Sequence, residues 1–298
     1  MKTTSLYQAV LMGTLMLIPS LAYAGEKVDK SLDAQSDGVV EIHNVRGDIR
    51  VIAWDNSEVK VTGELDDLTA KFIFESQGKV TYLKVEIPRR NANRGDGSDL
   101  KIMVPRGSRV DFNGVSTDLL LEQVEGGVDL RSVSGDLKVH DVKEQLFLNT
   151  VSGDIDVKNS AGQAKLNTVS GDIEAEMDSS EVSVNAVSGD IRLALKSYNS
   201  LVASTVNGEI WVTGQQQDGG KSMLSSVNGD ITLSFDDAVN ARVSIKSGPG
   251  GSIRNSISSD PVEDVFPNQQ RLRATLGDGS GQIKAGTVNG SITLKGHN

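Results

Sequence analysis

Acidic residues recur at an almost constant spacing through the middle of the chain, and this row of carboxylates is the feature best suited to chemistry. Carboxylate oxygens are the ligands that Ca²⁺ prefers, but that ion takes about six to eight of them, and the GGxGxDxUx pattern of calcium-binding β-rolls is missing. We therefore interpret the acids as turn residues that accept backbone N–H bonds, with Asp136, Asp154, Asp172 and Asp190 as weak cation candidates only. The complete row is Asp118, Asp136, Asp154, Asp172, Asp190, Glu209 and Asp230.

Nucleophilic catalysis has little support in the sequence. The three histidines, His43, His140 and His297, lie at no spacing that matches a motif, and the absence of Cys excludes thiol catalysis, disulfides and thiolate zinc sites. We predict no catalytic residue, no metal site and no cofactor, and therefore a protein that is not an enzyme. One enzyme alternative stays open: a β-helical polysaccharide lyase or hydrolase with carboxylates and arginines in a side groove.

Two aromatic residues are candidates for contact with a ligand or partner. Trp211 occupies an outward position that other repeats fill with polar residues, so stacked repeats would place it beside Arg192. The structural alternative is a cation–π contact that only covers the exposed ring. Phe147 is a second outward aromatic residue on a different strand. We predict Trp211, Arg192 and Phe147 as the surface candidates.

The elements that must position these residues follow from an internal repeat. Segments such as LNTVSGDIDV from Leu148 and LNTVSGDIEA from Leu166 recur along the chain. A fixed period of this kind is typical of solenoid folds, in which each repeat forms one rung. The motif valine recurs in steps of 18, 18, 18, 18, 19 and 21, at Val115, Val133, Val151, Val169, Val187, Val206 and Val227.

Each repeat contains two stretches of period-two alternation, which indicate two short strands. We predict an all-β fold, a single-stranded parallel β-helix or β-solenoid with about 18 residues per rung, whose equivalent aliphatic residues stack ~4.8 Å apart. The alternative is an antiparallel β-meander of repeated hairpins, because Asn-Gly between alternating strands is a strong hairpin signal. The motif valine would point to solvent in the meander. We expect it at an inward corner of the solenoid instead.

A glycine follows the motif serine or asparagine in most repeats. We expect it to form the corner of the rung with a positive φ, which glycine adopts without steric cost. We also expect Asn149, Asn167 and Asn185 to form an outward ladder of amides. The corner glycines are Gly135, Gly153, Gly171, Gly189, Gly208, Gly229 and Gly290.

The chain divides into a processed segment, a lead-in and one domain. Residues 1–24 read as a cleaved signal peptide, with Lys2, an apolar stretch and the cleavage pattern Ala22-Tyr23-Ala24. Residues 25–37 are polar and predict a flexible lead-in. A single β-solenoid domain then covers 38–298, with irregular rungs at 38–110, regular rungs at 111–235, and irregular rungs at 236–298 that carry an inserted loop near 256–270.

Charge and hydropathy restrict the partners and the compartment. The formal net charge of −10 argues against nucleic acids or an anionic membrane as the main partner. No stretch after the signal approaches the ~20 apolar residues of a membrane-spanning helix. We therefore expect an exported protein in the periplasm, with the cell surface or the extracellular space as alternatives.

Several motifs also carry a family resemblance. The recurrent TVSGDI, the Asn-Gly-Asp variants, the closing TVNGSITL from Thr287 and the upstream NVRGDIRVIAWDNSEVKVTG from Asn44 resemble the bacterial exported "putative adhesin" domain-of-unknown-function family. The resemblance runs from about residue 38 to 296. It implies a β-helical fold built from strand repeats. It implies no catalytic or binding residues.

Our leading functional hypothesis is a non-enzymatic scaffold or adhesin-like binding surface in the bacterial cell envelope. Its partner would be an envelope protein or glycan that the sequence does not identify. Besides the polysaccharide-active enzyme, a self-assembling structural envelope protein is the remaining alternative, because the ends of a solenoid expose strand edges that favour end-to-end pairing.

Overall fold

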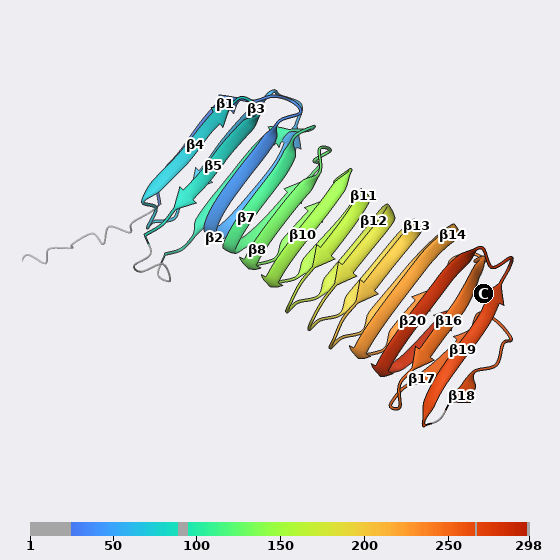
Figure 1. Cartoon of the computed structure of the whole chain (residues 1–298). Coiled ribbons are helices and arrows are strands. Elements are labelled where there is room, and N and C mark those ends of the chain that lie inside the picture. The colour runs from blue at the N-terminus through green and yellow to red at the C-terminus, as the bar shows by residue number, and fades with distance from the viewer. Residues whose placement is uncertain (1–24, 89–94, 266, 297–298) are drawn as a thin grey trace, which may run out of the picture.

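The computed structural model describes residues 25–88, 95–265 and 267–296, and every regular element in these ranges is a β-strand (Figure 1). The predicted all-β class is confirmed. The predicted signal peptide, residues 1–24, lies outside the described residues. The strands are β1 Lys27–Asp33, β2 Val39–Trp54, β3 Glu58–Glu64, β4 Lys71–Gln77, β5 Val80–Glu86, β6 Ser98–Pro105, β7 Arg109–Glu122, β8 Val128–Ser134, β9 Leu137–His140, β10 Gln145–Ser152, β11 Ile155–Asn167, β12 Ile173–Asn185, β13 Ile191–Ser204, β14 Ile210–Asn228, β15 Ile231–Ser234, β16 Ala241–Ser247, β17 Ser252–Ser256, β18 Glu263–Val265, β19 Gln269–Leu276, β20 Gly281–Asn289 and β21 Ser291–Lys295.

The middle of the chain pairs in parallel with copies of itself. Leu148 lies opposite Leu166 and Leu166 lies opposite Val184, so each residue pairs with its equivalent in the next repeat. The pairing continues from β7 through β8, β10, β11, β12, β13 and β14, and Figure 1 shows these strands side by side in one long stack. The antiparallel meander is therefore wrong for this part of the chain, because its neighbouring strands would run in opposite directions.

Each rung of the stack has two faces joined at the motif corner. The first face holds the residues that follow the corner, such as Ile155, and the second face holds the residues that precede it, such as Leu148. Because successive side chains of a strand point to opposite sides, each face directs one column of residues into the core. The first-face column is Leu137, Ile155, Ile173, Ile191, Ile210, Ile231 and Ile292, and all of its side chains are buried.

At both ends, rungs stack in an order that differs from the sequence. Strand β2 lies between β7 on one side and β5 and β6 on the other. At the opposite end, β20 lies between β14 and β16 (Figure 1). Strand β21 lies between β15 and β17. The last motif copy, with Val288, therefore packs directly on the rung that contains Val227, although five strands, β15 to β19, separate the two in the sequence.

Antiparallel strands cover the two ends of the stack. The predicted lead-in, residues 25–37, contains β1, which pairs antiparallel with β3 along its whole length and is therefore ordered. The predicted inserted loop near 256–270 contains β18 and the start of β19, and β19 pairs antiparallel with β16. The strand character of the lead-in was missed because β1 pairs with β3, which does not follow it directly in the sequence. Both segments give the outermost rungs hydrogen-bond partners that an open end would lack.

Tyr198 interrupts the aliphatic core at the bend between the two faces. Its side chain is fully buried, and its hydroxyl lies 3.1 Å from Ser222 Oγ, which in turn donates to Gln216 Oε1 at 2.6 Å. Burial raises the pKa of Tyr198 to about 12, because the apolar surroundings disfavour the charged phenolate. A buried tyrosine with a bonded hydroxyl thus fills the bend in the first rung that is longer than the regular repeat.

Replacement of Tyr198 by Phe should change the alkaline stability of the chain. The folded pKa is raised above the ordinary value of 10.0, so the stability that the neutral ring contributes is fully present below pH 10 and is lost as the pH rises through about 12. Tyr198→Phe should lose about 1 kcal/mol at neutral pH, since one hydrogen bond is removed. Its free energy of unfolding, measured by urea titration, should also fall less steeply than that of the wild type as the pH rises from 9 to 11. Equal pH slopes for the two proteins would contradict this assignment.

Candidate functional site

The corner glycines stack backbone against backbone. A Cβ atom placed on Gly153 would lie 2.2 Å from the carbonyl oxygen of Gly135, and one on Gly171 would lie 2.1 Å from that of Gly153. Gly135, Gly171, Gly189 and Gly290 have the expected positive φ, but Gly153, Gly208 and Gly229 do not lie in that region. The prediction of glycine corners holds, whereas the predicted reason is wrong for these three. Contact between neighbouring rungs, and not φ, requires glycine there.

The carboxylates beside the glycines bond to the backbone of the adjacent rung. The N–H of Asp154 donates to Asp136 Oδ1 at 3.0 Å, and the N–H of Asp172 donates to Asp154 Oδ1 at 2.8 Å. Each acid therefore stabilises the next corner in the stack through one oxygen. The same bond is formed by the N–H groups of Asp136, Asp190, Glu209 and Ser291.

The motif valines point outward, which contradicts the predicted inward corner. Val151 is 46% exposed and Val169 is 44% exposed, whereas Thr150 and Thr168 immediately before them are buried. The alternation of the second-face strand continues into the corner, so the residue before the valine takes the inward position. There the Thr168 hydroxyl donates to the carbonyl oxygen of Gly153 at 3.4 Å. A polar residue thus lies inside and an aliphatic residue outside.

We define the valine ladder as the exposed motif valines that lie next to one another along this edge. Their order follows from the parallel pairing of the residue after each valine. With a spacing of ~4.8 Å, seven steps give a stripe roughly 34 Å long. The ladder consists of Val115, Val133, Val151, Val169, Val187, Val206, Val227 and Val288, all between 40% and 52% exposed.

The two flanks of the valine ladder differ in charge. On the first-face side lies the acidic row, with one acid shortly after each valine in most rungs. On the second-face side, Asn167 Nδ2 donates to Asn149 Oδ1 at 2.8 Å and Asn185 Nδ2 donates to Asn167 Oδ1 at 3.0 Å. This confirms the predicted amide ladder. One flank is therefore anionic, whereas the other carries amides, with the basic Arg131 opposite Asn149 in the neighbouring rung.

The aromatic candidates lie on opposite faces and do not form one site. Trp211 pairs with Arg192 on the first face, and the guanidinium carbon lies 4.3 Å from the ring centroid, as the cation–π alternative predicts. Arg192 also donates to Asp190 Oδ2 at 3.0 Å. Phe147 lies on the second face between Asp129 and Lys165. The structure thus joins two of the three predicted surface residues.

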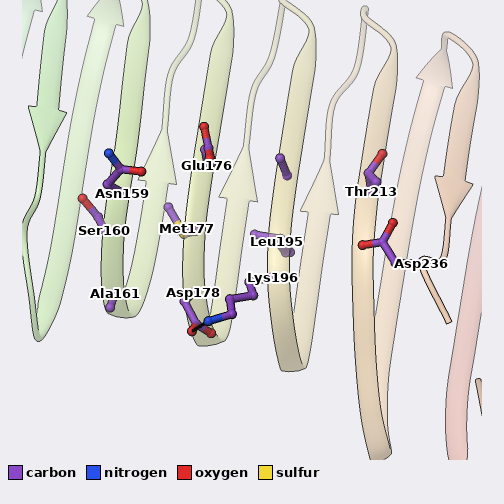
Figure 2. A pocket seen from close by; sticks show the side chains of 11 residues that line it. Asn159, Ser160, Ala161, Glu176, Met177, Asp178, Leu195, Lys196, Thr213 and Asp236 are labelled. Carbon is purple, nitrogen blue, oxygen red and sulfur yellow. Dashed lines mark ion pairs between the residues drawn. The ribbon is translucent and has the colours of Figure 1, made fainter.

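An open hollow lies on the first face, beside the bend (Figure 2). Its lining includes Glu176, Asp178, Lys196 and Asp236, and Lys196 Nζ lies 3.6 Å from Asp178 Oδ2. In the described ranges, no group of three or more His, Asp or Glu side chains is placed to hold a metal ion. The hollow therefore presents paired surface charges. Nothing in its lining indicates a nucleophile with a base.

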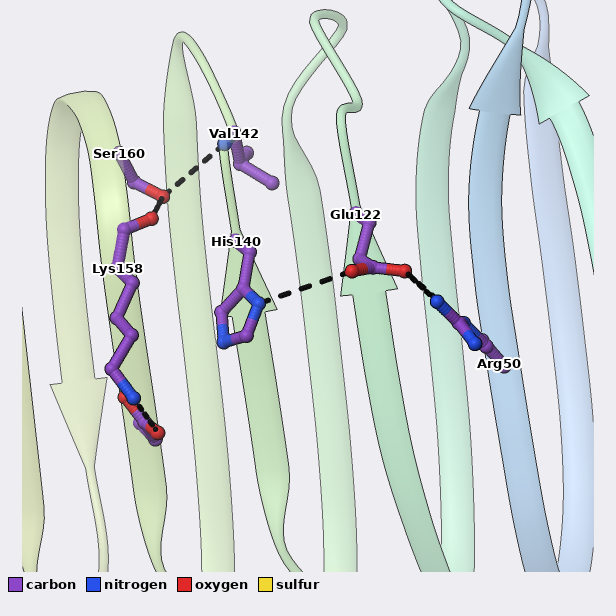
Figure 3. Close-up of polar contacts among 7 residues, drawn as sticks. Arg50, Glu122, His140, Val142, Lys158 and Ser160 are labelled. Atoms are coloured by element: carbon purple, nitrogen blue, oxygen red, sulfur yellow. Dashed lines mark hydrogen bonds and ion pairs between the residues drawn. The ribbon is translucent and has the colours of Figure 1, made fainter.

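His140 lies on the same face, nearer the N-terminal end, and is part of a charged row (Figure 3). Its Nδ1 is 4.0 Å from Glu122 Oε1, while Arg50 Nη2 donates to Glu122 Oε2 at 2.8 Å. Glu122 is thus shared between a histidine and an arginine of the two adjacent rungs. This geometry is that of a row of surface polar contacts centred on Glu122.

Sequence reasoning missed a buried ion pair at the N-terminal corner. Arg46 stands where later repeats have serine, and its guanidinium contacts the Asp66 carboxylate through Nε and through Nη2, the latter at 2.9 Å from Oδ1. The Asp66 side chain is 1% exposed and that of Arg46 is 11% exposed. The adjacent guanidinium lowers the pKa of Asp66 below its ordinary value. The arginine at position 46, where later repeats have serine, was the sequence signal that could have revealed this ion pair.

The repeat that builds this edge also decides the family. The sequence pattern of the Toastrack DUF4097 family matches residues 41–295. The chain belongs to the Toastrack DUF4097 family. This confirms the resemblance to a "putative adhesin" domain-of-unknown-function family. The valine ladder and its flanks lie wholly inside the matched part of this Toastrack chain.

Solved structures similar to this Toastrack chain include a "putative adhesin" from Bacteroides fragilis NCTC 9343, with 14% identity and a TM-score of 0.46. A "putative lipid binding protein" from Parabacteroides distasonis ATCC 8503 has 13% identity and a TM-score of 0.45. Each comparison covers 91% of this chain and 97% of the other. No curated protein matches the sequence. The described residues contain no helix long and apolar enough to cross a membrane.

Proposed function

We propose that this chain is an exported, non-enzymatic β-solenoid, with one sequence repeat per rung, that serves as a scaffold or adhesin-like binding surface in the bacterial cell envelope. The observation that carries the proposal is the valine ladder. A row of eight aliphatic side chains exposed along one edge has no role in the core, and contiguous exposed apolar surface is typical of interaction sites. The rod holds this row straight, because each corner is bonded to the next.

The enzyme alternative has less support. A polysaccharide lyase or hydrolase needs acids that converge on a bound sugar with an aromatic platform. Here Trp211 is stacked against Arg192, and Phe147 lies on the other face. The aspartates of the corner row each bond to a backbone N–H of the neighbouring rung. These groups are already used to hold the rod together.

End-to-end self-assembly is also less supported than binding along the edge. The outermost strand of the second face at the C-terminal end is β18, which is very short. At the N-terminal end, β1 carries the exposed charged residues Lys27, Asp29 and Lys30. Short and charged edge strands discourage strand addition. The ends are therefore poorly suited to stacking, whereas the long edge is free.

The proposal is tested by retention of envelope material on the purified exported chain. Outer-membrane, periplasmic and peptidoglycan fractions of the source bacterium are passed over immobilised protein, either wild type or with Val151→Thr, Val169→Thr and Val187→Thr combined. Threonine keeps the branched shape that suits a strand and removes part of the apolar surface. We expect the wild type to retain at least one fraction component and the variant to retain at least fivefold less. Equal retention by both proteins, or none by the wild type, would overturn the proposal. So would product release from an acidic glycan panel that Asp154→Ala or Asp172→Ala abolishes.

A further inference from the structure

We infer that the valine ladder and the acidic row together bind a cationic amphipathic helix of a partner protein. The apolar side of the helix lies along the valines, and its Lys and Arg side chains lie over the carboxylates. This inference rests on the proposed function and names the class of partner. It follows from the backbone bonds, the length of the stripe and the difference between its two flanks.

The backbone at the corner offers nothing to an incoming strand. The N–H of Ser170 donates to the Val151 carbonyl at 2.8 Å, and the N–H of Gly153 donates to the Ser170 carbonyl at 3.1 Å. The following N–H, that of Asp154, bonds to the Asp136 side chain. These three donors are therefore paired within the stack, and the corresponding acid N–H groups of Asp136, Asp172, Asp190 and Glu209 form the same bond. A partner must satisfy its own backbone and contact the ladder through side chains, which a helix does.

The dimensions of the ladder suit a helix of ordinary length. A stripe of roughly 34 Å corresponds to about 23 helical residues at 1.5 Å per residue. The ladder is one valine wide, so it matches the narrow apolar stripe of an amphipathic helix better than a broad apolar face. Successive helical turns repeat every ~5.4 Å, close to the ~4.8 Å between rungs.

The charge of the flanks determines which helix fits. The corner aspartates use Oδ1 for the neighbouring rung, so the second oxygens of Asp136 and Asp154 are not used in that bond. Arg192 is the basic side chain seen to contact these acids in the described structure, at Asp190 and, at 3.9 Å, Asp172. The opposite flank carries the amides of Asn149, Asn167 and Asn185 and, in the rung before them, Arg131, so it has no row of acids at these positions. A partner with basic residues on one side of its apolar stripe therefore complements the edge.

A second copy of this chain is a poorer occupant of the edge. Each copy has a formal net charge of −10 and would bring its own acidic row to the contact. Like charges across an interface oppose association, and they bring no basic residues to the carboxylates. A cationic helix gains both contacts at once. The test must therefore distinguish self-association of the chain from binding of a cationic helix.

The inference is tested with a synthetic peptide as the probe. The peptide has about 22 residues, close to the helical length of the stripe, with Leu along one helical stripe and Lys along one flank. A second peptide has the same composition in scrambled order. Binding is followed by fluorescence anisotropy at low and high salt. We expect the striped peptide to bind at least tenfold more tightly than the scrambled one. We also expect weakening at high salt, because the carboxylate contacts are screened.

Two matched variants separate the ladder from net charge. Asp154→Asn, Asp172→Asn and Asp190→Asn combined keep the Oδ1 acceptors and remove three charges, and should weaken binding at least tenfold. Glu176→Gln, Asp178→Asn and Glu181→Gln combined remove three charges away from the ladder and should weaken it less than twofold. Thermal unfolding midpoints check that all variants are folded. Equal losses from the two triple variants would overturn the inference.

The remaining outcomes are equally decisive. The Val151→Thr, Val169→Thr and Val187→Thr variant should lose at least tenfold in affinity for the striped peptide, and unchanged affinity would overturn the inference. So would ladder-dependent self-association of the chain at the same concentrations in light scattering. If the peptide fails while the envelope fraction is still retained through the ladder, the partner class is wrong and the proposed function stands. If neither binds, both are wrong.

Discussion

Replacement of Gly153 by alanine should destabilise the chain by roughly 2 to 3 kcal/mol. The added Cβ would lie 2.2 Å from the Gly135 carbonyl oxygen and 2.7 Å from its carbon, so the backbones of two rungs must separate. Backbone atoms held in a stacked ladder cannot turn away as a side chain end can. Because Gly153 does not have a left-handed φ, alanine tests the contact between rungs alone. Valine at the same position should cost still more.

A matched control is Gly286→Ala in β20. The nearest atom to a Cβ on Gly286 is the Lys246 carbonyl oxygen at 3.8 Å, which is ordinary contact. We expect the free energy of unfolding of this variant to lie within about 0.5 kcal/mol of the wild-type value. Unfolding in guanidinium chloride, followed by circular dichroism, measures both. If Gly153→Ala unfolds at the same denaturant concentration as Gly286→Ala, the rungs do not stack at van der Waals contact through their glycines.

Replacement of Arg46 by leucine should cost about 3 to 5 kcal/mol at neutral pH, the range for removing one partner of a buried ion pair. The variant leaves the Asp66 carboxylate buried without its guanidinium. Arg50→Leu is the matched control on the same strand, since its contact with Glu122 is exposed and should contribute less than about 1 kcal/mol. Equal destabilisation by the two variants would contradict the assignment.

The acid dependence of the Arg46 variant has a defined sign. The Arg46 guanidinium lowers the pKa of Asp66 below its ordinary value of 3.8. The stability contributed by this pair is therefore fully present above pH 3.8 and is lost as the pH falls through the lower folded value. The difference in stability between wild type and Arg46→Leu should shrink on acidification below pH 4. A difference that stays constant from pH 7 to 3 would show that the ionised carboxylate is not responsible.

The regular part of the fold could be predicted because its sequence signal is local and repeated. The spacing of the motif valines gives the distance between paired residues, and alternation such as Leu146 and Leu148 identifies the buried side of the strand. The end rungs could not be predicted in the same way. The insertion of β2 between β5 and β7, and of β20 between β14 and β16, depends on pairing between distant segments. Nothing local in the sequence specifies that order.

The orientation of the motif valine shows where a general rule failed. An aliphatic residue in every repeat indicates burial, yet Val151 is exposed and Thr150 is buried. The strand alternation of Leu148 in, Asn149 out and Thr150 in already placed Val151 outside. In this inward column the Thr168 hydroxyl donates to the Gly153 carbonyl, whereas Thr150 Oγ1 is buried without a hydrogen-bond partner among the described residues. The surface we assign to binding was therefore encoded in the alternation and obscured by hydrophobicity.

Thiol labelling at two adjacent positions tests the exposure of the valine ladder most directly. The chain has no cysteine of its own, so Val169→Cys and Thr168→Cys each supply one defined thiol. We predict that the Val169→Cys thiol reacts with a charged maleimide at nearly the rate of an unfolded peptide, and that the Thr168→Cys thiol is protected until the rod unfolds. Fast labelling at position 168 and protection at position 169 would place the valines in the core and leave no surface for a partner.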